Sequence, residues 1–212
     1  MILAILLIDQ VIKIWVKTSM TLHESIHMTD WFYITFIENN GMAFGMQLGS
    51  KIVLSLFRVA AIALLGYYIW HLVRQHAKTG YIICLSMVLA GAAGNLIDCM
   101  FYGLVFNASS PFYLSYFVPF GTGYAPFLMG KVVDMFYFPL FETDWPSWVP
   151  FVGGDHFVFF SPVFNFADAC ISVSVVWLLL FYHQEISKIS LTQVADQKDQ
   201  KPESPNEGKQ EE

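Results

Sequence analysis

The chain has 212 residues, of which 56% are hydrophobic and 13% charged, and its mean hydropathy is +0.52. This composition excludes an ordinary soluble domain and is typical of an integral membrane protein. The formal net charge is -6 and the 11 Lys and Arg residues are scattered, which excludes nucleic-acid binding as an expected function.

Four apolar stretches predict four transmembrane helices. They cover roughly residues 1–17, 52–70, 81–98 and 162–182. Each stretch approaches the ~20 residues that a helix needs to cross about 30 Å of hydrocarbon. The first stretch has no basic leading region and no clear cleavage site, and it carries Asp9 and Lys13. We therefore interpret it as a retained helix and not as a secretory signal.

The depth of Asp9 is an open question in this first helix. Only eight residues precede it, which corresponds to about 12 Å of helix. Either its carboxyl is buried at mid-depth, or the natural chain starts upstream of Met1.

The positions of Lys and Arg predict that both termini are cytoplasmic. Arg74 and Lys78 lie in the link after the second helix and Lys188 follows the fourth, whereas residues 18–50 contain neither residue type. The polar residues 186–212 are expected to form a disordered cytoplasmic tail. Residues 1–185 then make up the membrane domain.

The segments between the helices predict a small β-rich cradle and aromatic insertions on the outer side. Residues 31–37 are aromatic and β-branched and lead into Asn39-Asn40-Gly41, which indicates a strand followed by a turn. Residues 107–129 and 139–161 have the aromatic content of a membrane-interface layer. They fit either a lid that guides substrate or a loop anchored at the interface.

Two polar pairs lie at the outer ends of predicted helices. Asn95 and Asp98 are three residues apart at the end of the third helix, as are Asn165 and Asp168 at the start of the fourth. Each pair therefore shares a helix face. Asp134 comes from the segment between these helices, and a carboxylate beside hydrocarbon is costly. We expect Asp134 and Asp168 to meet in one pocket, where both cannot ionise easily.

These residues belong to five motifs that, in this order along the chain, resemble the lipoprotein signal peptidases (signal peptidase II). The motifs are Asp9–Lys13, Glu38–Gly45, Gly91–Asp98, Val132–Asp134 and Phe164–Asp168. The resemblance covers nearly the whole chain up to the tail. It implies a multi-pass aspartic endopeptidase of the bacterial inner membrane with its active site near the outer face. Its substrate would be a diacylglyceryl-modified prolipoprotein, cut on the amino side of the lipidated cysteine.

The resemblance also implies roles for individual residues. Asp134 and Asp168 match the catalytic pair. The other polar residues of the family's pocket match Asp9, Lys13, Asn39, Asn95, Asp98 and Asn165. We expect these six to hold the substrate backbone and to orient the catalytic pair. No cofactor and no metal is expected, the partners are the prolipoprotein and membrane lipid, and the enzyme is expected to work as a monomer.

The chain departs from the family pattern at one position. Cys99 stands where family members commonly have an arginine directly after the G-N-x-x-D motif. Either the contact expected from that arginine is absent here, or Arg58 or Lys131 supplies it.

Two other functions compete with the peptidase hypothesis. Residues His23 to His27 spell H-E-x-x-H, the zinc-protease signature, which needs a helix and a third ligand. Its position in an outer segment indicates a solvated loop instead. Intramembrane carboxylates also mark proton or ion pathways. Four helices are few for a carrier, and no inverted repeat is apparent.

Overall fold

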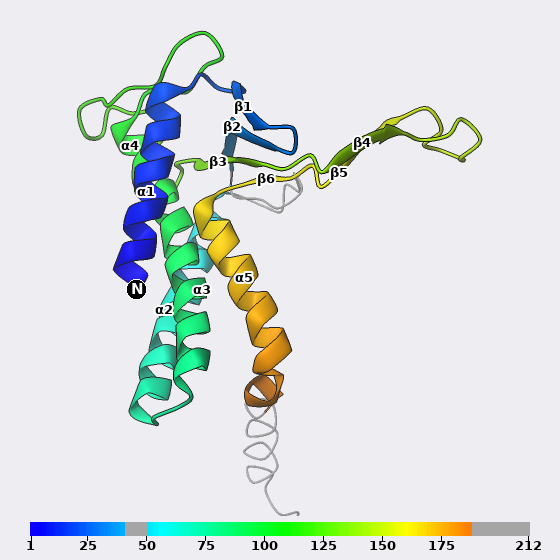
Figure 1. Cartoon of the computed structure of the whole chain (residues 1–212). Helices are drawn as coiled ribbons and strands as arrows, with labels where there is room; N and C mark the ends of the chain where they lie inside the picture. The colour runs from blue at the N-terminus through cyan, green and yellow to red at the C-terminus, as the bar shows by residue number, and fades with distance from the viewer. Residues whose placement is uncertain (41–50, 188–212) are drawn as a thin grey trace, which may run out of the picture.

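The long apolar runs form helices in the computed structural model, which describes residues 1–40 and 51–187. The four long helices are α1 (Ile2–Ser19), α2 (Lys51–Arg74), α3 (Thr79–Ile97) and α5 (Phe166–Phe181). They run roughly along one axis, with the strands gathered near one end (Figure 1). Helix α5 begins later than the predicted residue 162, because the segment before it forms strand β6 (Val163–Phe164) and Asn165 caps the helix.

Helix α3 continues past its motif in two short turns. A π-helical turn, η2 (Asp98–Tyr102), is followed by α4 (Gly103–Val105). Together with α3 they form a 27-residue helical stretch. An 18-residue window of this stretch has a mean hydropathy of 1.8, and one within the 24 residues of α2 has 2.1. By length and composition both stretches are able to cross a membrane. Helix α5 is apolar but has only 16 residues.

A four-stranded antiparallel sheet lies at the end of the bundle that holds the polar motifs. Its strand order is β1 (Ser25–Thr29), β2 (Phe32–Asn39), β3 (Val132–Tyr137) and β6. The strand predicted for residues 31–37 is therefore confirmed as β2, although it extends through Asn39. Gly41 and the rest of its motif, to Gly45, lie outside the described residues.

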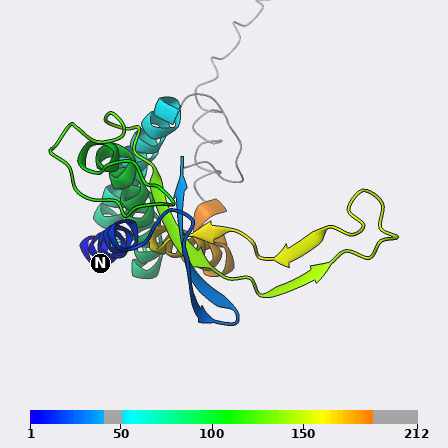
Figure 2. The same cartoon turned by 90° about the horizontal axis from the view of Figure 1, so that it is seen from above.

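A second hairpin projects from the body as an arm. It pairs β4 (Phe141–Asp144) with β5 (His156–Phe159). The arm extends sideways from the level of the sheet (Figure 1), and from above it points away from the loop after α4 (Figure 2). The aromatic segment 139–161 is thus a β-ribbon and not an irregular loop. Residues 188–212 of the predicted tail lie outside the described residues, and 186 and 187 belong to a helical turn over 183–187.

Two apolar clusters hold these parts together. The cluster near the sheet joins the end of α1 to β2, β3 and the loop after α4 through Val16, Met20, Phe36, Tyr102, Phe106, Val133 and Met135. The cluster at the opposite end joins α2, α3 and α5 through Ile69, Leu72, Tyr81, Cys84, Leu85 and Leu178. The first cluster places the sheet against the helix ends, where the polar motifs lie.

Helices α3 and α5 approach each other closely at a glycine. A Cβ atom on Gly91 would lie 2.5 Å from the Ala167 carbonyl oxygen and 2.6 Å from Cγ1 of Ile171. Small residues permit such approach between membrane helices. The fit fixes the position of the first turn of α5, which carries Asp168.

Substitution of Gly91 by alanine tests this packing. We expect Gly91→Ala to lower the free energy of unfolding by about 1–3 kcal/mol, because the added methyl group meets backbone and side-chain atoms that have little room to move. Gly66→Ala in α2 is the control, since nothing lies within 4 Å of its added Cβ. Thermal unfolding in detergent measures both variants. Equal stability of the two would contradict the close approach.

Candidate active site

The predicted catalytic aspartates come from two elements that the sheet brings together. Asp134 lies in the middle of β3 and its side chain is only 3% exposed. Asp168 lies in the first turn of α5 and is half-buried. Strand β6 pairs with β3 and leads directly into α5. This connection brings the start of α5 to the strand that carries Asp134.

Asn165 connects the two aspartates. Its amide Nδ2 donates to Oδ1 of Asp134 at 2.7 Å, and its Oδ1 accepts from the backbone N–H of Asp168 at 2.9 Å. The Asp168 carboxylate in turn accepts from the backbone N–H of Asn165 at 3.3 Å, which completes a capping box. One buried side chain therefore touches both predicted catalytic residues.

Asn95 holds the other side of Asp168. Its Nδ2 donates to Oδ1 of Asp168 at 2.7 Å, while its Oδ1 accepts from Nδ2 of Asn165 at 3.0 Å and from Nζ of Lys13 at 2.7 Å. An ammonium group only donates. Lys13 therefore fixes the Asn95 amide with its oxygen toward the lysine and its N–H groups toward Asp168.

Lys13 is the cation of a fully buried charge cluster. Its Nζ lies 2.9 Å from Oδ2 of Asp9 and 2.8 Å from Oδ2 of Asp98, and all three side chains are at most 1% exposed. Gln10 bridges the two carboxylates, donating at 3.1 Å to Asp9 and at 2.9 Å to Asp98. The cluster ties α1 to the end of α3.

The same two carboxylates hold the backbone next to each predicted catalytic aspartate. Asp9 Oδ1 accepts from the N–H of Ala167 at 3.0 Å, and Asp98 Oδ2 accepts from the N–H of Val133 at 3.3 Å. These residues directly precede Asp168 and Asp134. The charge cluster thus holds the backbone beside both predicted catalytic aspartates at once.

Asn39 completes the set by a side-chain hydrogen bond to Asp134 from the end of β2. All six predicted supporting residues are therefore connected to the catalytic pair, directly or through one partner. Their individual roles in the reaction stay predictions.

The environment of Asp134 favours its protonated form. Burial raises its pKa to about 7, and the negative charge of Asp168 acts in the same direction against hydrogen bonds from Asn165 and Asn39. Asp134 can thus keep a proton near neutral pH. Perturbation of this kind is typical of catalytic groups.

The sequence interpretation missed a second cluster of buried charge. Lys17 is buried and pairs with Glu38, which also pairs with Lys131 at 3.0 Å and accepts from Ser109 at 2.7 Å. Burial would raise the pKa of Glu38, but the two lysines and Ser109 outweigh it and hold the pKa below its ordinary value. The signal was present, because Lys17 lies four residues after Lys13 on the same face of α1.

The position of Cys99 has a neighbouring cation. Nη1 of Arg58 donates to Sγ of Cys99 at 3.3 Å. Of the two residues expected to replace the family arginine, Arg58 therefore lies beside Cys99, whereas Lys131 is engaged with Glu38.

The H-E-x-x-H match does not have the geometry of a zinc site. Ser25–Thr29 form the exposed strand β1, so His27 lies in a strand, and His23 has φ 70 in the turn before it. The solvated loop expected here is an exposed strand. Glu24 accepts from the backbone and the hydroxyl of Thr21 at 2.7 and 2.9 Å. The helix that the motif requires is absent.

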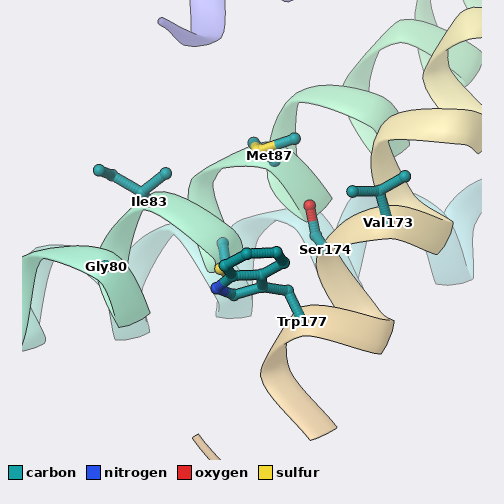
Figure 3. A pocket seen from close by; sticks show the side chains of 7 residues that line it. Gly80, Ile83, Met87, Val173, Ser174 and Trp177 are labelled. Atoms are coloured by element: carbon teal, nitrogen blue, oxygen red, sulfur yellow. The ribbon is translucent and has the colours of Figure 1, made fainter. Parts of the chain in front are cut away.

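A cavity of about 330 Å³ lies between α3 and α5, toward the ends far from the sheet (Figure 3). Its lining is nearly all apolar: Gly80, Ile83, Cys84, Met87, Val173, Ser174 and Trp177. The Ser174 hydroxyl bonds to the Cys170 carbonyl within α5. The cavity contains no carboxyl group and plays no part in the site.

Comparison with known proteins places this geometry in a family. The family described as Signal peptidase (SPase) II matches residues 1–184. A lipoprotein signal peptidase of Porphyromonas gingivalis is 50% identical over 188 residues, covering 88% of this chain and 83% of the relative. One from Amoebophilus asiaticus is 34% identical over 200 residues, covering 89% and 80%. A solved bacterial membrane enzyme, determined by the in meso method at 2.3 Å resolution, aligns with a TM-score of 0.54 at 20% identity, covering 96% of this chain and 90% of that one. This last likeness shows the fold.

The buried charge cluster generates a stability test. We expect Lys13→Met to lower the free energy of unfolding by about 3–5 kcal/mol, because two buried carboxylates lose their cation. The double variant Lys13→Met with Asp98→Asn should recover part of this loss. Lys78→Met is the control, since Lys78 is exposed in its pair with the half-buried Glu185, and the pair should contribute less than about 1 kcal/mol. Chemical denaturation in detergent measures each variant, and similar losses for Lys13→Met and Lys78→Met would refute the role of the cluster.

Proposed function

The chain belongs to the signal peptidase II family of aspartic peptidases, and we propose that Asp134 and Asp168 are the catalytic pair with which it removes signal peptides from prolipoproteins. One observation carries the assignment of residues. Asn165 hydrogen-bonds the Asp134 carboxylate and the backbone of Asp168, so that two carboxyls distant in the sequence share one buried partner.

The different surroundings of the two carboxyls indicate different roles in proton transfer. Asp134 is buried and its pKa is raised to about 7, so it is the proton donor. Asp168 is half-buried in the first turn of α5, and its carboxylate accepts hydrogen bonds from Asn95 and from the backbone of Asn165. Asp168 is therefore the base. The shared proton is a property of the pair.

Hydrolysis then follows by general acid-base catalysis. Asp168 takes a proton from water as the water oxygen bonds to the scissile carbonyl carbon, and Asp134 gives its proton to the carbonyl oxygen. In the second step the proton held by Asp168 passes to the leaving nitrogen as the C–N bond breaks. The proton on the former carbonyl oxygen returns to Asp134, which restores the starting state.

The proposed substrate carries a diacylglyceryl group on the cysteine that follows the cut. Asp168 lies in the first turn of α5, a helix whose exposed residues farther along are largely apolar, including Val173, Val176 and Leu180. An acyl-anchored substrate that moves sideways in the bilayer therefore reaches the carboxyls without leaving the lipid. Both carboxyls come from one chain, which supports a monomeric enzyme.

The proposed arrangement has all four long helices crossing the bacterial inner membrane, with both termini cytoplasmic. Arg74 and Lys78 lie at the turn between α2 and α3, and Lys78 pairs with Glu185 just after α5. Basic residues concentrate on the cytoplasmic side of membrane proteins. The sheet and the catalytic pair then lie at the outer face.

Isosteric substitution tests the catalytic pair. We expect Asp134→Asn and Asp168→Asn each to reduce cleavage of a lipidated lipobox peptide by about 10²–10⁴-fold or more, because each removes one proton-transfer group. Asp30→Asn is the control, since that side chain is fully exposed in the β1–β2 turn. Product formation by purified protein measures the effect, with thermal unfolding to show that each variant is folded. Undiminished cleavage by either Asn variant would refute the assignment.

The same assay tests lateral entry. A peptide of the same sequence without the diacylglyceryl group should be cleaved much more slowly. Equal cleavage of the two peptides would reject lateral entry and leave the catalytic assignment intact.

The pKa of Asp134 predicts the alkaline limb of the pH profile. Below about pH 7 this carboxyl holds the proton that it must donate, and above that value it loses it. We therefore expect kcat/KM to fall as the pH rises through about 7. The hydrogen bond from Asn39 lowers the pKa of Asp134, so Asn39→Ala should move the limb to higher pH. A profile that is flat to pH 9, or a limb that moves to lower pH, would contradict this division of roles.

A further inference from the structure

The arm formed by β4 and β5 has no partner among the described residues beyond its own root. A two-stranded hairpin is marginally stable in water by itself. The arm nevertheless spans residues 139–161 and extends sideways from the helix bundle (Figures 1 and 2). Something outside the described chain is therefore expected to contact it.

The strand register gives the arm two unlike faces. Phe141 lies opposite Phe159, and Thr143 lies opposite Phe157, so that these residues share one face. Ring contacts confirm it: Phe141 stacks on Phe159 at 5.0 Å, and Trp145 lies 5.3 Å from Phe157.

The other face of the arm is polar. Glu142 lies opposite Val158 and Asp144 lies opposite His156. His156 lies 2.9 Å from Asp144 and 3.6 Å from Glu142. The arm is thus an amphipathic ribbon.

The tip of the arm carries two highly exposed rings. Trp148 is 80% exposed and Phe151 is 104% exposed. Phe151 also has φ 70, a conformation that bulky side chains rarely adopt. A strained backbone that displays a large apolar side chain is a feature that a water-exposed loop would not favour.

The root of the arm lies at the depth of the membrane boundary. The 16 residues of α5 measure about 24 Å, less than the roughly 30 Å of hydrocarbon that a spanning helix must cross. With α5 crossing the membrane as proposed, a helix that covers most of this thickness starts near the outer hydrocarbon edge, so the segment that leads into α5 lies there. The arm leaves the body there and runs sideways, so it lies along the bilayer surface.

The charge of the arm also indicates which part of the membrane it contacts. Residues 139–161 contain no Lys or Arg and three acids, Glu142, Asp144 and Asp155. Electrostatic attraction to anionic lipid headgroups therefore contributes nothing to binding of the arm to the membrane. Aromatic side chains, in contrast, are favoured at the interface between headgroups and acyl chains.

We propose that the β4–β5 arm lies in the outer-leaflet interface, with its aromatic face and tip in the acyl boundary and its polar face toward water. This inference rests on the proposed crossing of the membrane by α5. The arm then acts as a lateral anchor that holds the catalytic pair at a fixed depth relative to the bilayer.

Single-tryptophan variants in zwitterionic vesicles test this arrangement. The chain has six tryptophans, which are replaced by phenylalanine except for the one under study. Trp148 reports on the tip. Phe157→Trp and Val158→Trp, neighbours on opposite faces of β5, form a matched pair. Trp177, in α5, reports on membrane crossing. Each variant is first shown to cleave substrate, and its emission is then recorded with brominated phosphatidylcholine and with iodide.

We expect brominated lipid to quench Trp148, Phe157→Trp and Trp177, and iodide to quench Val158→Trp, with no change when anionic lipid or salt is added. If Trp177 is quenched by lipid while Trp148 and Phe157→Trp respond only to iodide, the arm proposal is overturned and the membrane crossing of α5 stands. Absence of lipid quenching at Trp177 would reject the crossing itself. Shielding of Trp148 from both quenchers would place it against protein, either substrate or a second copy, and would also overturn the proposal.

Discussion

A buried lysine held between two carboxylates is the constraint on which the rest of the site depends. Lys13 neutralises Asp9 and Asp98, and those carboxylates accept the backbone N–H groups that directly precede Asp168 and Asp134. Removing a charge from such a cluster is far more damaging than its net contribution suggests, since the partner charges stay buried. The cluster therefore makes the position of the proposed catalytic residues inseparable from the packing of α1 on α3.

The two aspartates are chemically identical, and the different roles proposed for them rest on what surrounds them. Asp134 lies in a buried strand where desolvation favours its neutral form, whereas Asp168 lies at a helix start with donors directed at its oxygens. The amides of Asn95 and Asn165 have only one orientation that satisfies all their partners, because Lys13 and the helix cap each fix one end. Orientation is thus built into the fold before substrate arrives.

The sequence was informative where a residue type is energetically unfavourable in its surroundings unless the structure requires it. Carboxylates and amides beside apolar runs predicted which residues lie together in the candidate site, and β-branched and aromatic residues predicted β2. The start of α5 was missed although Asn165 and Asp168 spell a capping box, because the apolar run began earlier, at residue 162. The arm was missed for another reason: aromatic content reports an interface, but strand pairing across the long connection from Asp144 to His156 depends on contacts that no local pattern specifies.

Asn165 has two structural roles, since it caps the start of α5 and also hydrogen-bonds Asp134. Fraying of a single helical turn would therefore disassemble the reaction centre while most of the bundle stays intact. Heat or membrane-fluidising solvents would then abolish peptidase activity well before they unfold the protein. A binder that lodges against that turn, without reaching either acid, would have the same effect.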